Sequence, residues 1–257
     1  MTSAHQKKLI NDVALITGAT RGIGKAVATA YLREGARVFI CARNQQQVAA
    51  TVRELRDGST DAQVDGCAGD VGKETDVCRI VEAAIERFQT IDTLVNNASL
   101  LGPRVDLVQY SIKQWEEVIR VNLHGVFLLS QQVVKRMIAQ RHGSIINVSS
   151  GVGRVGRARW GAYAVSKFGL EGFTQVLADE VKEFGIRVNS VNPGPTRTEM
   201  RAEAYPEEDP LTLPTPEQIT PLFVHLASAQ SENLTGQMLE AKDWAERVNE
   251  LGSGIRL

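Results

Sequence analysis

The sequence has little cysteine, few aromatic residues and almost no net charge. Its three cysteines, Cys41, Cys67 and Cys78, are an odd number without metal-ligand spacing, which is typical of reduced thiols in a cytoplasmic protein. A net charge of −1 over 257 residues gives no reason to expect nucleic acid or a membrane surface as a partner. No apolar run is long enough to span a bilayer, and the first residues lack the apolar core of a signal peptide. The four histidines are scattered, so we expect no metal site.

Short stretches rich in valine and isoleucine alternate with longer amphipathic stretches along most of the chain. The pattern predicts strands at 13–17, 37–41, 63–68, 93–96, 144–148, 186–191 and 235–239, with helices at 22–33, 45–56, 74–88, 111–139, 162–185 and 217–227. Strands that alternate with helices in this way form parallel sheets through right-handed crossovers. We therefore expect one α/β domain over 1–257, a doubly wound, Rossmann-type parallel sheet of about seven strands with helices on both faces.

The alternation stops after Pro193. Residues 196–216 contain four prolines, at 206, 210, 214 and 216, among acidic residues. A long proline-rich segment inside a compact domain is usually functional, so we interpret it as a small lid over the substrate, and the alternative is an ordinary surface loop.

A glycine-rich turn lies between the first predicted strand and the first predicted helix. Its glycines, Gly18, Gly22 and Gly24, follow a GxxxGxG spacing, interleaved with Thr20, Arg21 and Ile23. Glycines at this place let the backbone turn tightly and approach a pyrophosphate, which the free N–H groups of the helix N-terminus can bind. The strand–turn–helix context makes this pattern more specific than the glycines alone.

The end of the second strand distinguishes the two nicotinamide dinucleotides. An acidic residue there would bind the ribose 2′-hydroxyl, but the sequence has Arg43 and no carboxylate. Arg21 adds a second cation that could reach a 2′-phosphate, so we expect NADP as the cofactor rather than NAD. Asp70 and Val71 follow the third strand, where Asp70 could accept from the adenine amino group or cap a turn.

Tyr163 and Lys167 are four residues apart in a predicted helix and share one face. An ammonium beside a phenol favours the phenolate, so we expect the pKa of Tyr163 to fall toward neutrality, which suits proton transfer. Ser149 and Ser150 end the preceding strand, where a hydroxyl could point at the tyrosine. The alternative is a solvated helix face with no catalytic role.

Taken together, these motifs resemble the short-chain dehydrogenase/reductase family. The set comprises TGATRGIG, Asn96-Asn97-Ala98, Asn122, Ser150, Tyr163-x-x-x-Lys167 and Asn192-Pro193-Gly194, in that order, over residues 10–240. The chain is most similar to the shorter, single-domain branch and, within it, to an uncharacterised bacterial group of oxidoreductases. Ser150 stands thirteen residues before Tyr163, which matches the family pattern and selects it over Ser149.

The resemblance implies roles for these residues. Tyr163 would be the general acid or base, Lys167 would lower its pKa and bind the nicotinamide ribose, and Ser150 would stabilise the carbonyl oxygen. Asn122, a poor residue for the middle of a helix, would hold a water of a proton relay. Asn97 would line the cofactor, and Pro193, Gly194, Thr196 and Thr198 would cover the nicotinamide carboxamide. The expected partners are a small carbonyl or alcohol substrate and further copies of the chain, in a homodimer or homotetramer.

The sequence departs from the family pattern in three places. Ser99 replaces a glycine, and Glu240–Trp244 replaces a glycine pair near the C-terminus, which leaves the oligomer open. Arginines crowd the segment before Tyr163, namely Arg154, Arg157 and Arg159, beside Trp160. They could bind an anionic substrate or belong to a solvated loop or an interface. Trp160, with Met200 and Tyr205 of the predicted lid, suggests partly apolar walls.

The leading hypothesis is an NADPH-dependent carbonyl reductase or alcohol dehydrogenase. One alternative is a protein of the same fold that binds NADP(H) as a sensor or scaffold without turnover, although all four residues of the catalytic set are present. Another is an epimerase or dehydratase of the family's extended branch, whose chains are longer and carry a larger C-terminal substrate domain.

Overall fold

The computed structural model describes residues 6–58 and 61–244. The strands are β1 (Val13–Thr17), β2 (Arg37–Ala42), β3 (Val64–Ala68), β4 (Thr93–Asn96), β5 (Gly143–Val148), β6 (Ile186–Asn192) and β7 (Met238–Glu240). The α-helices are α1 (Gly22–Arg33), α2 (Gln45–Asp57), α3 (Glu74–Phe88), α4 (Ile112–Ile119), α5 (Gly125–Gln140), α6 (Gly161–Val181), α7 (Glu199–Ala204) and α8 (Thr220–Ala227). A π-helical segment, Arg120–His124, joins α4 to α5.

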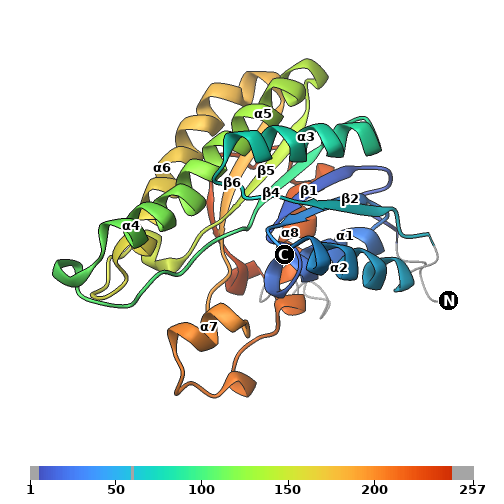
Figure 1. Ribbon diagram of the computed structural model, residues 1–257. Helices are drawn as coiled ribbons and strands as arrows, with labels where there is room; N and C mark the ends of the chain where they lie inside the picture. Colours follow the sequence, from blue (N-terminus) through green and yellow to red (C-terminus); the bar gives the residue numbers. More distant parts are fainter. Residues whose placement is uncertain (1–5, 59–60, 245–257) are drawn as a thin grey trace, which may run out of the picture.

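The seven strands form one parallel sheet in the order β3-β2-β1-β4-β5-β6-β7. Chain order reverses between β1 and β4, so the crevice outside their carboxyl ends is where doubly wound folds bind ligands. Helices α1, α2 and α8 cover one face, and α3, α5 and α6 cover the other (Figure 1). The structure thus confirms the predicted doubly wound sheet with helices on both faces.

Each face of the sheet packs a separate apolar cluster. Alternate residues of a strand point to opposite faces, so Ala14 and Ile16 of β1 join the α1 and α8 side while Val13 and Leu15 join the α3 and α5 side. All four side chains are fully buried, which explains why the strand reads as an unbroken apolar run. This double burial fixes the height of the strand ends and therefore of the loops that follow them.

The predicted bounds need correction in two places. The predicted 111–139 helix is continuous in path, but the π-helical turn interrupts its α-helical hydrogen bonding at Arg120–His124. The last strand is shorter than 235–239, because the backbone turns at Gly236 (φ 70°) and pairs with β6 only from Met238.

The segment after β6 stands apart from both helix layers. Figure 1 shows α7 and the chain that follows it (orange) projecting from one end of the molecule. Single turns of 3-10 helix at Pro210–Thr212 and Pro216–Ile219 lead into α8. No helix within 6–58 or 61–244 combines the length and apolar character needed to cross a membrane. The prediction of one domain over 1–257 also includes residues 1–5, 59–60 and 245–257, which lie outside the described residues.

Candidate active site

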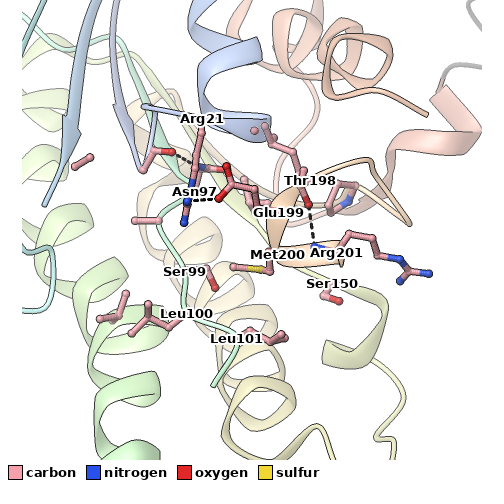
Figure 2. Close-up of a pocket in the computed structure, with 18 of the residues that line it drawn as sticks. Arg21, Asn97, Ser99, Leu100, Leu101, Ser150, Thr198, Glu199, Met200 and Arg201 are labelled. Atoms are coloured by element: carbon pink, nitrogen blue, oxygen red, sulfur yellow. Dashed lines mark hydrogen bonds and ion pairs between the residues drawn. The ribbon is translucent and has the colours of Figure 1, made fainter. Parts of the chain in front are cut away.

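A cavity of about 770 Å³ opens at the carboxyl ends of the strands (Figure 2). Most of the predicted site residues line it, namely Gly18, Thr20, Arg21, Gly22, Ile23, Arg43, Asp70, Val71, Asn97, Ser150, Tyr163, Lys167, Pro193, Gly194, Thr196 and Thr198. Two predicted residues, Gly24 and Asn122, lie behind its wall. The topology therefore brings together groups from six strand ends that are far apart in the sequence.

The glycine turn is built for a close approach of backbone to backbone. Gly18 has φ 63°, and a Cβ there would lie 2.9 Å from Cα of Ala98. A Cβ on Gly24 would lie 2.5 Å from Nδ2 of Asn97 and 2.7 Å from the carbonyl oxygen of Gly18. Gly18 and Gly24 thus both allow the glycine turn and α1 to pack closely against the loop after β4.

The start of α1 leaves donors for an anion. The N-cap residue, Arg21, makes no side-chain capping bond, so the first N–H groups of the helix point toward the cavity without a side-chain acceptor. Arg43 is exposed at the end of β2 and has no ion-pair partner among the described residues. This donor set, with a free guanidinium one strand away from a helix N-terminus, fits a dinucleotide that carries a 2′-phosphate.

Three predicted cofactor contacts are already engaged with protein groups. The Asn97 amide donates to the carbonyl oxygens of Thr17 (2.8 Å) and Gly18 (3.1 Å), so it braces the glycine turn. The Asp70 carboxylate accepts from Nη1 of Arg120 at 2.8 Å and from the N–H of Gly72 at 3.0 Å. The turn-capping alternative therefore describes Asp70 better than an acceptor for adenine. The Arg21 guanidinium pairs with Glu199 of α7 (Figure 2).

Tyr163 and Lys167 lie on one face of α6, and that face is buried. Their exposed fractions are 8% and 3%, so the alternative of a solvated face is wrong. Nζ of Lys167 donates to the carbonyl oxygen of Val148 at 2.7 Å and lies 5.5 Å from the centroid of the Tyr163 ring. Ser150 lines the same cavity, and its hydroxyl interacts with that of Tyr163 in the sense that lowers the tyrosine's pKa. The three side chains thus meet where β5 ends and α6 begins.

The expected fall in the pKa of Tyr163 is wrong. Burial raises its pKa to about 12, and the hydrogen bond from Ser150 opposes that rise only in part. Burial also lowers the pKa of Lys167 to about 8, against the attraction of the nearby Glu171 carboxylate. Burial outweighs the Tyr163–Lys167 interaction because both charged forms lose their hydration. At neutral pH the tyrosine is therefore a phenol and the lysine an ammonium.

Asn122 lies in the π-helical turn and is fully buried. Its amide oxygen accepts from the N–H of Leu100 at 2.8 Å, and its Nδ2 donates to the carbonyl oxygen of Leu100 and to Oγ of Ser166. The side chain thus ties the loop after β4 to α6, next to Lys167. π-Helical turns are frequent at functional sites. The sequence signal for this one is an asparagine in the middle of a predicted helix.

Apolar side chains form the wall of the cavity beyond Ser150. They are Leu100, Leu101, Trp160, Met200 and Ala204. The sequence indicated Trp160 and Met200, but it gave no sign of the two leucines, which belong to a loop without a motif. Two buried hydroxyls that line the cavity, on Ser99 and Ser149, have no hydrogen-bond partner among the described residues. They leave polar capacity for a ligand in an otherwise apolar wall.

The hypothesis that the arginines before Tyr163 bind an anionic substrate is wrong for the geometry seen here. Arg154 pairs with Glu240 and lies 3.8 Å from the Glu171 carboxylate, both away from the cavity. Arg159 pairs with Asp106, and neither it nor Arg157 lines the cavity. Glu240, at the unusual C-terminal end, also accepts from Nδ2 of Asn192 at 2.7 Å. Two of the departures from the family pattern, the arginine at 154 and the glutamate at 240, therefore form one ion pair.

Residues 196–216, part of which line the cavity, are held by charge pairs and ring contacts. Arg201 binds both carboxylate oxygens of Glu208, each at 2.6 Å. The Arg104 guanidinium packs against the neighbouring rings of Trp160 (4.5 Å) and Tyr205 (4.9 Å) and donates to the carbonyl oxygen of Ala204. The sequence did not indicate Arg104, because its partners come from two distant segments.

Comparison with known proteins agrees with this geometry. The short chain dehydrogenase family profile matches residues 12–209. A curated Escherichia coli protein, called uncharacterized oxidoreductase YciK, is 38% identical over 240 residues, covering 92% of this chain and 94% of its own.

Two crystal structures of bacterial relatives contain the nucleotide. A Shigella flexneri protein complexed with NADP superposes with a TM-score of 0.87 at 36% identity, covering 92% of this chain and 99% of its own. An Escherichia coli protein complexed with NADPH gives a TM-score of 0.88 at 36% identity, covering 93% of this chain and 100% of its own. With the doubly wound sheet, the glycine turn and the buried Ser150–Tyr163–Lys167 group in one cavity, the chain belongs to the short-chain dehydrogenase/reductase family.

Proposed function

We propose that the protein is an NADP(H)-dependent oxidoreductase that interconverts a carbonyl compound and a secondary alcohol. The observation that carries the proposal is the buried group of Ser150, Tyr163 and Lys167 in the same cavity as the glycine turn. Buried titratable groups with shifted pKa values in a cleft are typical of catalysis rather than of structure.

The choice of NADP over NAD depends on the end of β2. Arg43 lines the cavity there, is exposed, and has no ion-pair partner in the described chain, so it can bind a 2′-phosphate. Relatives of this chain were crystallised with NADP and with NADPH, which supports the proposal. Arg21 would join Arg43 at the phosphate if it exchanged its partner Glu199.

In this mechanism, side chains of α6 and of the turn after β5 carry out the proton transfer. Bound NADPH would supply the hydride to the carbonyl carbon. Tyr163, which burial keeps protonated at neutral pH, would donate its phenolic proton to the carbonyl oxygen. Ser150 would donate to the same oxygen, and the Lys167 ammonium would stabilise the phenolate left behind. The protonated phenol favours reduction at neutral pH over the reverse reaction.

The surrounding residues would position the reactants. We assign Pro193, Gly194, Thr196 and Thr198 to the nicotinamide end of the cofactor, because they follow β6 and line the cavity beside Ser150. Residues 196–216 would act as the lid. Asn122 would fix the loop that carries Leu100, with the proton relay as its further proposed role.

The test is oxidation of NADPH by the purified protein across a broad panel of ketones and aldehydes. We expect turnover with NADPH, little with NADH, and loss of turnover in Tyr163→Phe. In Arg43→Ala the preference for NADPH should fall by roughly 10-fold or more, because one charge-assisted contact to the phosphate is lost. Tight NADPH binding without turnover of any carbonyl would favour the sensor or scaffold instead, and turnover that prefers NADH would contradict the reading of Arg43.

We also propose that the protein forms a homo-oligomer through the outer face of α6. Val165, Phe168 and Val176 are exposed there at helical spacing, and Phe127 of α5 is exposed as well. Contiguous exposed apolar side chains on one face are typical of association surfaces. Light scattering after gel filtration should give a dimer or tetramer, and Phe168→Glu should shift the mass toward the monomer.

A further inference from the structure

The charged side chains that line the cavity are almost all neutralised before any ligand enters. Arg21 pairs with Glu199, Asp70 with Arg120, and Arg201 with Glu208. Two lining cations have no carboxylate within ion-pair distance among the described residues. They are Arg43, at the nucleotide end, and Lys167, which belongs to the catalytic group. Among the residues that line the substrate end, no cation other than Lys167 is left without a carboxylate partner. The Arg104 guanidinium does not line the cavity and has no carboxylate partner in the described chain either, but it packs against the rings of Trp160 and Tyr205 and donates to the carbonyl oxygen of Ala204.

Arg201 is the one arginine of residues 196–216 that lines the substrate end. Its Nε and Nη2 both donate to Glu208, in the bidentate geometry that matches a guanidinium to a carboxylate. The Tyr205 ring covers the guanidinium at 3.8 Å. In Figure 2 the Arg201 side chain extends away from Leu100, Leu101 and Met200. Glu208 thus occupies the two donors that a substrate anion would need.

The rest of the wall is unsuited to an anion. Leu100, Leu101, Trp160, Met200 and Ala204 offer no charge, and the unpartnered hydroxyls of Ser99 and Ser149 are neutral donors. A carboxylate that leaves water for such a wall loses its hydration without gaining a counterion, which is strongly unfavourable. An uncharged ester or ketone of the same size suffers no such loss.

We propose that the protein takes uncharged, apolar carbonyl substrates, and that Glu208 sets this specificity by neutralising Arg201. This inference rests on the function proposed above. Glu208 is a specificity-determining residue that acts through Arg201 and does not contact the substrate.

The experiment compares ethyl acetoacetate with acetoacetate, which present the same ketone with and without a charge. We expect kcat/KM for the ester to exceed that for the acid by about 100-fold or more, because only the acid must bury a charge. Glu208→Gln removes the countercharge and should lower this ratio by at least about 10-fold. Glu207→Gln, a change at the exposed neighbouring glutamate, should leave the ratio as in the wild type. Calorimetry of both ligands should show the same order of affinities.

The outcomes separate this inference from the function it rests on. A wild-type ratio below about 5, or an equal response to Glu208→Gln and Glu207→Gln, overturns the role of Glu208 while the reductase stands. Failure to reduce any carbonyl overturns the proposed function, and the order of affinities by calorimetry still decides whether the cavity rejects the anion. Should Glu208→Gln not fold, Met200→Lys places a new cation in the wall and is expected to lower the ratio in the same way.

Discussion

Helix α6 and residues 196–216 line the same cavity but are held in place by different forces. The reactive face of α6 is buried, and its side chains bond to backbone and side chains of the core, as Lys167 does to Val148. Residues 196–216 include one short α-helix, α7, and single turns of 3-10 helix. They depend on charge pairs and ring contacts near the surface, such as Arg21–Glu199 and Arg201–Glu208.

The difference separates the chemistry of the protein from its specificity. Core packing restricts the Tyr163 side chain, as the proposed proton transfer requires. Surface ion pairs contribute little to stability, so the residues that make them can change without unfolding the protein. We therefore expect changes in α6 to abolish activity and changes in residues 196–216 to redirect it. Four experiments test this difference.

The largest effect is expected at Tyr163. Tyr163→Phe removes the proposed proton donor and should lower kcat by about 10²- to 10⁴-fold with NADPH affinity retained. Steady-state kinetics and fluorescence titration of NADPH measure the two quantities. Tyr110→Phe is the matched control, because its hydroxyl is buried near the site without a partner in the described residues. If Tyr163→Phe keeps a tenth of the wild-type kcat, the expectation that changes in α6 abolish activity is wrong.

The next effect is expected at Gly24, which packs α1 against the loop after β4. Gly24→Ala would drive a Cβ to 2.5 Å from Nδ2 of Asn97, so we expect a loss of about 1–3 kcal/mol in the free energy of unfolding and weaker NADPH binding. Denaturant unfolding measures the first and titration the second. Gly156→Ala meets no atom within 4 Å and should change stability by less than about 0.5 kcal/mol. Equal losses in the two variants would contradict the close approach.

The third effect concerns pH. Because burial lowers the pKa of Lys167 to about 8, the lysine loses its charge as pH rises through that value, while Tyr163, whose pKa is about 12, keeps its proton. Carbonyl reduction should therefore fall above pH 8, by about tenfold at pH 9, with one apparent pKa. Lys167→Arg, which stays charged, should not show this fall in rate above pH 8, whatever its absolute rate. A flat wild-type profile to pH 10 would show that the charge is not needed.

The smallest effect is expected at Arg104, which packs against Trp160 and Tyr205. Arg104→Met removes two cation–π contacts of about 0.5–2 kcal/mol each, and we expect KM for the carbonyl to rise about 3- to 10-fold with kcat nearly unchanged. Arg157→Met, an exposed arginine outside the cavity, should leave both constants unaltered. A fall in kcat without a change in KM would show that Arg104 affects the chemical step and not substrate binding, contrary to this expectation.

The sequence predicted what depends on local pattern. Strands buried on both faces show as apolar runs, so six of the seven, from β1 to β6, were located within one residue. The glycine turn and the Tyr163–Lys167 spacing are local as well, and the fold carried them to one cavity as expected.

What the sequence could not show depends on long-range partners and on burial. Arg154 and Glu240 are 86 residues apart, and each was an unexplained departure until the fold joined them. The pKa of Tyr163 rises instead of falling because its surroundings exclude water, and spacing along a helix does not reveal that. Leu100 and Leu101 line the cavity in a loop that the hydrogen bonds between Asn122 and the Leu100 backbone hold in place, and no local pattern shows these bonds.

The two ends of the segment after β6 meet each other. The N–H of Arg197 donates to the carbonyl oxygen of Pro214 at 2.9 Å, and the Arg197 side chain donates to the carbonyl oxygens of Pro210 and Leu213. The stretch between these residues is thus a loop that closes on its own base. For protein engineering, a loop with adjoining ends is a segment that can be exchanged. We expect that a loop of another length, taken from a relative, can replace the part of this stretch after Glu199 without moving β6 or α8. Thr198, the proposed nicotinamide contact, and Glu199, the partner of Arg21, would then stay in place while the substrate preference changes.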